Sequence, residues 1–158
     1  MQPELVELSA EYSHWFAEYS PGLESWGVRP LDVRLQVEDG EIDRKRHPAA
    51  EQYEVLQQQL TQHLEVKKAI LSALEGIYPK LIAFDGGDRH LLPDTLDSAA
   101  DLERFLDFQY VLITERSGDS GRPMAGYAFD SIINPEHGIG LLLDGLQVVA
   151  IGGEEDAW

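Results

Sequence analysis

The stretch "GIGLLLDGLQVVAIG", residues 138–152, decides the fold of this chain. Two apolar runs, residues 138–143 and 147–151, lie on either side of the dipeptide Asp144-Gly145. This dipeptide between two apolar runs is a strong signal for a tight hairpin turn. We therefore predict two antiparallel strands with Asp144-Gly145 at the tip.

Toward the N-terminus, the same pattern continues. Two more apolar runs, residues 108–114 and 124–132, are separated from each other and from the hairpin by turn residues. Four consecutive strands with short turns predict an antiparallel meander.

The middle of the chain is helical. Apolar residues at helical spacing mark two faces, and the phase breaks between Leu64 and Val66, which predicts two helices or one helix bent near 62–65. Pro48 suits the first turn, while Gly76 and Pro79 are expected to end the second helix. Asp97 or Ser98 caps a predicted short helix through Leu106.

These elements predict an α+β fold, an antiparallel β-meander with two to three helices packed on one face. The strict alternation of residues 31–37 predicts one more, half-buried strand. Residues 4–19 follow helical spacing but are rich in aromatic residues, so a helix and strands both stay open. The length of 158 residues suits a single domain, 1–158.

The charge of the chain is strongly negative. Twelve Lys and Arg stand against 29 Asp and Glu, a net charge of −17, and no Lys or Arg follows Pro123. This balance disfavours direct binding of nucleic acid or of an anionic membrane, and it favours a basic protein partner. Alternatively, the acidity only keeps the protein soluble. There is no cysteine, no apolar run of membrane-spanning length and no visible secretory signal, so we expect a cytoplasmic location.

One run is similar to the nucleophile loop of trypsin-like serine proteases: "SGDSGRP", residues 117–123. A serine nucleophile needs an oriented histidine base, and no upstream histidine lies in the family's catalytic context. Gly, Asp, Ser and Pro are also ordinary loop residues, so we interpret the run as a turn between two strands.

Metal and cofactor sites are not expected. The five histidines are scattered, and Asp85-Gly86-Gly87-Asp88 lacks the spacing of an EF-hand loop. No phosphate-binding glycine motif is present. The one basic cluster, Arg44-Lys45-Arg46, is interpreted as a solvated loop beside nearby acids.

The run Glu136-His137-Gly138-Ile139-Gly140 allows two interpretations. A Glu-His pair is able to act as general acid and base. Alternatively the run is structural, a turn after Asn134-Pro135 whose glycines permit close backbone packing, with His137 bonded to a neighbouring backbone group. We favour the structural role for Glu136, His137, Gly138 and Gly140, because no second catalytic group is identifiable.

"NPEHGIGLLLDGLQVVAIGGEEDA" resembles the C-terminal signature of a family of small, acidic bacterial proteins that end in a Glu-His-Gly-[Leu/Ile]-Gly strand, a hairpin and an acidic tail. The early-helix Gln52 and the helix ending near Tyr78 also fit its layout, although Ile133-Asn134 departs from the usual aromatic-acidic run. The resemblance implies strands near residues 4–9 and 14–19.

Proteins of this kind occur as immunity proteins of secreted toxin systems, including contact-dependent and type VI systems. The resemblance implies an immunity protein that is no enzyme and blocks a cognate toxin, such as a nuclease, by stoichiometric binding. A regulatory or housekeeping binding module and a small enzyme using Glu136 and His137 stay open. Acidity and loop position suggest these partner-binding candidates: Asp39, Glu41, Asp43, Glu154, Glu155 and Asp156.

Overall fold

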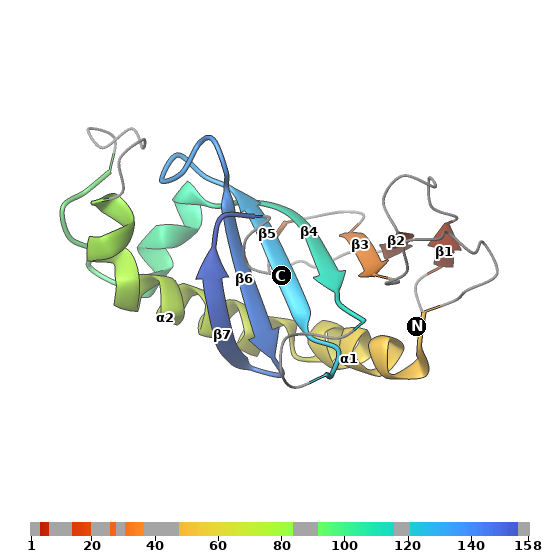
Figure 1. Ribbon diagram of the computed structural model, residues 1–158. Helices are drawn as coiled ribbons and strands as arrows, with labels where there is room; N and C mark the ends of the chain where they lie inside the picture. Colours follow the sequence, from red (N-terminus) through yellow and green to blue (C-terminus); the bar gives the residue numbers. More distant parts are fainter. Residues whose placement is uncertain are drawn as a thin grey trace.

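In the part of the chain that the structure describes, seven strands form one sheet, and they follow each other across it in chain order, from β1 at one edge to β7 at the other (Figure 1). The computed structural model describes residues 4–6, 14–19, 26–27, 31–36, 48–83, 92–115 and 121–154. The strands are β1 (Glu4–Val6), β2 (His14–Tyr19), β3 (Leu31–Gln36), β4 (Asp107–Ile113), β5 (Ala125–Asp130), β6 (Ile139–Asp144) and β7 (Gln147–Gly152).

The predicted meander is confirmed in β4 to β7, where each strand pairs antiparallel with the next. Asp144 pairs with Gln147, so Gly145 and Leu146 form a two-residue turn. Gly145 has a φ of +61°, a conformation that glycine adopts without steric cost. The hairpin is therefore formed as predicted, with its tip one residue further along the chain.

The pairing of β3 with β4 is parallel and was not predicted. Parallel neighbours need a long crossover connection, which here holds the helices α1 (Ala50–Thr61), α2 (His63–Ile82) and the 3₁₀ helix η3 (Ala99–Phe105). The crossover lays α1 and α2 along one face of the sheet (Figure 1). The α+β prediction is confirmed, and residues 4–19 form β1 and β2 rather than a helix where they are described.

The boundary between α1 and α2 lies at Gln62, within the predicted bend. The prediction that Gly76 and Pro79 end the second helix is wrong, because α2 continues to Ile82. Tyr78 and Ile82 are buried, whereas Pro79 is exposed, so packing of the last turn outweighs the one hydrogen bond that proline cannot donate.

The core lies between the helices and alternate residues of β3 to β6. Two buried glutamines of α1 tie the layers together. Gln52 Oε1 accepts from the backbone N–H of Ala49 at 2.8 Å, and its Nε2 donates to the carbonyls of Gln36 at 2.7 Å and Ile113 at 3.2 Å. Gln59 Oε1 accepts from the Tyr127 hydroxyl at 2.7 Å, while its Nε2 donates to Gly145 O at 2.8 Å. Each amide therefore joins a helix to the sheet without leaving its own polar atoms unpaired.

Candidate functional site

The turn from Ser131 to Gly138 joins β5 to β6 and is held by its own hydrogen bonds. Gly138 N–H donates to Asn134 O at 2.8 Å, and the Asn134 side-chain amide donates to Gly138 O at 3.0 Å. Gly138 has a φ of +64°, and a Cβ on it would lie 2.6 Å from Phe129 O. Only glycine fits this position, because any side chain would meet the backbone of β5.

The side chains of Glu136 and His137 point into solvent, with exposed fractions of 83% and 68%. His137 Nε2 lies 3.9 Å from Glu136 Oε2, beyond hydrogen-bond reach. The backbone carbonyl of His137 accepts from Glu154 N–H at 2.8 Å, which ties the turn to the end of β7. His137 thus contributes to the turn through its backbone, and no direct hydrogen bond joins its side chain to that of Glu136.

Four carboxylates gather at this end of the sheet. Asp107, the first residue of β4, stands directly opposite Asp130, the last residue of β5, and both are exposed. Asp130 also lines a surface hollow with Glu136 and Glu154. We call Asp107, Asp130, Glu136 and Glu154 the acidic end; Arg104 lies beside it, in a hollow shared with the two aspartates.

Like charges directly opposite each other disfavour strand pairing. The facing of Asp107 and Asp130 therefore weakens the pairing of β4 with β5 at this end, and the cationic Arg104 lines the hollow beside them. Among the residues that the structure describes, no group of three or more His, Asp or Glu is arranged to hold a metal ion.

Of the partner-binding candidates chosen from sequence, the structure describes one. Glu154 is half-buried and belongs to the acidic end. Asp39, Glu41, Asp43, Glu155 and Asp156 lie outside the described residues, as do the Arg44–Arg46 and Asp85–Asp88 runs.

Asp107 and Asp130 were missed by sequence reasoning. The available signal was that Asp107 directly precedes the predicted run 108–114 and that Asp130 lies near the end of the run 124–132, its predicted antiparallel neighbour. Gly140, the last residue of the Glu-His-Gly motif, is buried in β6 opposite Ala128 and Gly152. It belongs to the sheet rather than to the acidic end.

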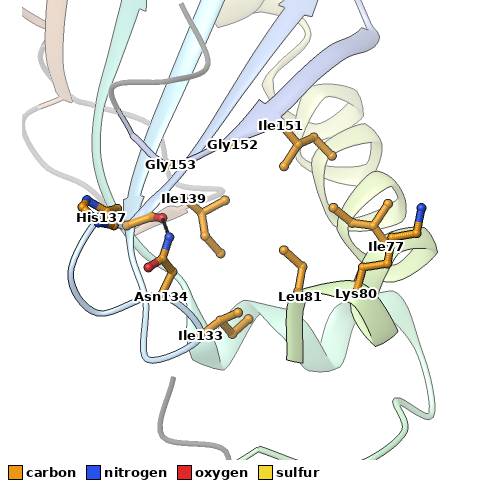
Figure 2. Close-up of a pocket in the computed structure, with 11 residues that line it drawn as sticks. Ile77, Lys80, Leu81, Ile133, Asn134, His137, Ile139, Ile151, Gly152 and Gly153 are labelled. Carbon is orange, nitrogen blue, oxygen red and sulfur yellow. Dashed lines mark hydrogen bonds between the residues drawn. The ribbon is translucent and has the colours of Figure 1, made fainter. Parts of the chain in front are cut away.

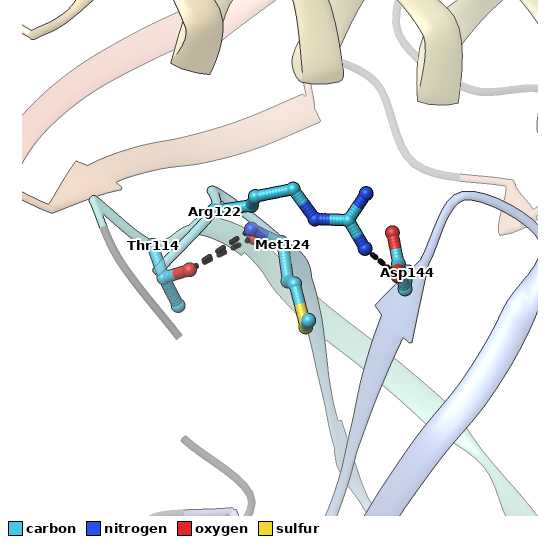
Figure 3. A network of polar contacts seen from close by, with 4 residues as sticks. All are labelled: Thr114, Arg122, Met124 and Asp144. Carbon is cyan, nitrogen blue, oxygen red and sulfur yellow. Dashed lines mark hydrogen bonds and ion pairs between the residues drawn. The ribbon is translucent and has the colours of Figure 1, made fainter. Parts of the chain in front are cut away.

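The protease-like loop is described only from Gly121 onward, so Ser120 lies outside the described residues. The described part closes the β4–β5 connection (Figure 3). Thr114 N–H donates to Met124 O at 2.9 Å, Met124 N–H donates to Thr114 Oγ1 at 3.0 Å, and Arg122 pairs with Asp144 at 2.5 Å. These contacts are those of a turn that fixes strand ends.

Comparison of the chain with protein-family models, with curated proteins and with solved structures found no match. The resemblance to the acidic bacterial family therefore stays a prediction. Among the described helices, none combines the length and the apolar composition needed to cross a bilayer.

Proposed function

We propose that this chain is a non-catalytic cytoplasmic binding protein, the immunity protein of a secreted bacterial toxin, and that its partner presents a basic surface. The observation that carries the proposal is the acidic end. Four carboxylates from β4, β5, the following turn and the end of β7 line two adjoining hollows there, with one facing pair held in register by the sheet. The resemblance of the C-terminal stretch supplies the class of partner.

Complementary charge accelerates the encounter of two proteins and selects among partners. A net charge of −17 attracts a basic toxin over a distance, and the acidic end offers it a fixed set of acceptors. A nuclease suits this description, since its substrate-binding surface must be basic to hold phosphates.

The test compares two triple variants that remove the same charge. Asp107→Asn/Asp130→Asn/Glu136→Gln neutralises three of the four carboxylates of the acidic end, and Glu54→Gln/Glu65→Gln/Glu75→Gln neutralises three exposed helix positions. The proposal requires a toxin gene next to the gene of this chain in the producing strain, and the product of that gene serves as the partner. Co-expression with that toxin measures protection, and surface plasmon resonance measures the association rate.

We expect the wild type and the helix variant to protect cells, and the acidic-end variant to associate about ten-fold more slowly or worse. Equal association rates for both variants would remove the acidic end as the interface. Failure of the wild type to protect against, or to bind, the toxin would reject the immunity function.

A further inference from the structure

A pocket of about 370 Å³ lies between α2 and the β6–β7 end of the sheet, next to the acidic end (Figure 2). Ile77 and Leu81 of α2 form one wall, and Ile139 and Ile151 of the sheet form the facing wall. Ile133 closes the bottom in the view of Figure 2. We call this the aliphatic pocket. Its volume falls at the lower end of the range found for ligand-binding pockets.

The pocket has an aliphatic part, and the polar side chains that line it are those of Lys80, Asn134 and His137. Its apolar side chains are all isoleucine or leucine. Asn134 is engaged with the carbonyl of Gly138, and Lys80 and His137 stand on opposite sides of the pocket (Figure 2). A polar group inserted into the aliphatic part would lose its bonds to water without replacement. The occupant therefore has an aliphatic body.

The charged residues around the pocket indicate which charge the occupant carries. The pocket and the acidic hollow share His137, Gly138 and Gly153, so the two depressions adjoin. On that side a ligand meets Asp130, Glu136 and Glu154. On the α2 side it meets Lys80, which disfavours a second cation there. An aliphatic group with a cationic group on one side matches this arrangement.

We infer that the aliphatic pocket takes one leucine, isoleucine or valine side chain of the partner, and that Lys or Arg residues beside it in the partner bind the acidic end. The inference rests on the proposed function and names the feature of the partner that its site recognises. Binding energy in protein interfaces concentrates in a few side chains that fill well-packed, desolvated pockets, and the contacts around them mainly exclude water. The charges then steer the encounter, and the anchor slows dissociation.

The experiment uses a defined peptide with the whole chain, observed through isoleucine and leucine methyl resonances. The probe is acetyl-Ser-Gly-Leu-Arg-Arg-Gly-amide. One control peptide replaces its leucine with serine, a second replaces both arginines with glutamate, and isocaproate tests a small aliphatic anion. We expect the probe to shift the methyl signals of Ile77, Leu81 and Ile151 at saturation. Each control peptide should bind about ten-fold more weakly or not at all.

Two variants test whether the probe binds in the aliphatic pocket. Ile77→Gln puts an amide in the pocket wall and should weaken the probe about ten-fold. Val149→Gln changes a β7 residue outside the pocket, 47% exposed, and should leave the affinity unchanged.

The inference would be overturned if the serine peptide bound as tightly as the probe, or if the methyl signals of the pocket did not shift. It would also be overturned if Ile77→Gln left the affinity for the probe unchanged, or if isocaproate bound more tightly than the probe. Toxin protection is measured separately. If the wild type binds the probe but does not protect cells from the toxin, the proposed function alone is rejected. If the Ile77→Gln variant protects cells and binds the toxin as tightly as the wild type does, the pocket alone is rejected.

Discussion

Gly138 shows at the scale of one residue what the Glu-His-Gly motif does for the fold. Its positive φ turns the chain into β6, and its missing side chain lets the turn approach Phe129 O. The sequence indicated a glycine needed for close packing, and this holds for Gly138. The sequence did not show that His137 acts through its backbone while its side chain is exposed. Its carbonyl accepts from Glu154 N–H, and this contact depends on where β7 ends.

Gly138→Ala is expected to lower the free energy of unfolding by about 3 kcal/mol or more. The positive φ costs roughly 1–2 kcal/mol for a residue with a Cβ, and the 2.6 Å approach to Phe129 O adds the cost of moving β5. Gly121→Ala is the matched control, because Gly121 has a φ of +63° and no atom within 4 Å of the added Cβ. Urea unfolding of both variants measures the difference. Equal losses would show that the contact with β5 is unimportant.

At the scale of elements, the strands of the second half of the chain were predictable and the arrangement of the first half was not. Residues 138–151 carry local turn and strand signals that agree with each other, so β6 and β7 follow from sequence. The parallel pairing of Val33 with Val111 joins segments far apart in the chain, and no local pattern encodes it. The length of α2 was also underestimated, because burial of Tyr78 and Ile82 is a tertiary effect.

The same limit applies to the site. Glu136, His137 and Glu154 were recognisable as acidic or motif residues. The facing of Asp107 and Asp130 depends on strand register, which includes an irregularity between Phe108 and Tyr110. Register decides which side chains face each other, and a shift of one residue changes every pair.

Tyr127 of β5, whose hydroxyl donates to Gln59 of α1, predicts a specific response of stability to alkaline pH. Burial raises the pKa of the Tyr127 hydroxyl far above its ordinary value of 10, so the folded protein keeps this proton while the unfolded chain releases it near pH 10. The free energy of unfolding should therefore be unaffected below about pH 10 and fall above it, by about 1.4 kcal/mol per pH unit for this group.

Tyr127→Phe tests that contribution. The variant should be about 1–3 kcal/mol less stable near pH 7, because Gln59 Oε1 loses its buried partner. Its stability should then decline less steeply than that of the wild type above pH 10. Tyr53→Phe is the comparison, since burial also raises the pKa of Tyr53, which is only half-buried. Denaturant unfolding across pH 8–11 measures this decline. If the free energy of unfolding falls equally steeply with pH for Tyr127→Phe and for the wild type, Tyr127 is not the group responsible.

At the scale of the whole molecule, the net charge of −17 must act on folding as well as on binding. Self-repulsion of like charges destabilises a compact chain, and salt screens it over about 10 Å near 0.1 M. We expect the thermal midpoint to rise when NaCl increases from about 0.02 M to about 0.3 M, by about 2–4 °C for each kcal/mol of repulsion removed. Glu54→Lys/Glu75→Lys reverses two exposed helix acids and should raise the midpoint at low salt while reducing its salt dependence. Differential scanning calorimetry of both proteins measures the effect. A midpoint independent of salt in the wild type would show that the acids are spaced too widely to repel each other, and it would weaken the case that their field draws a basic partner from solution.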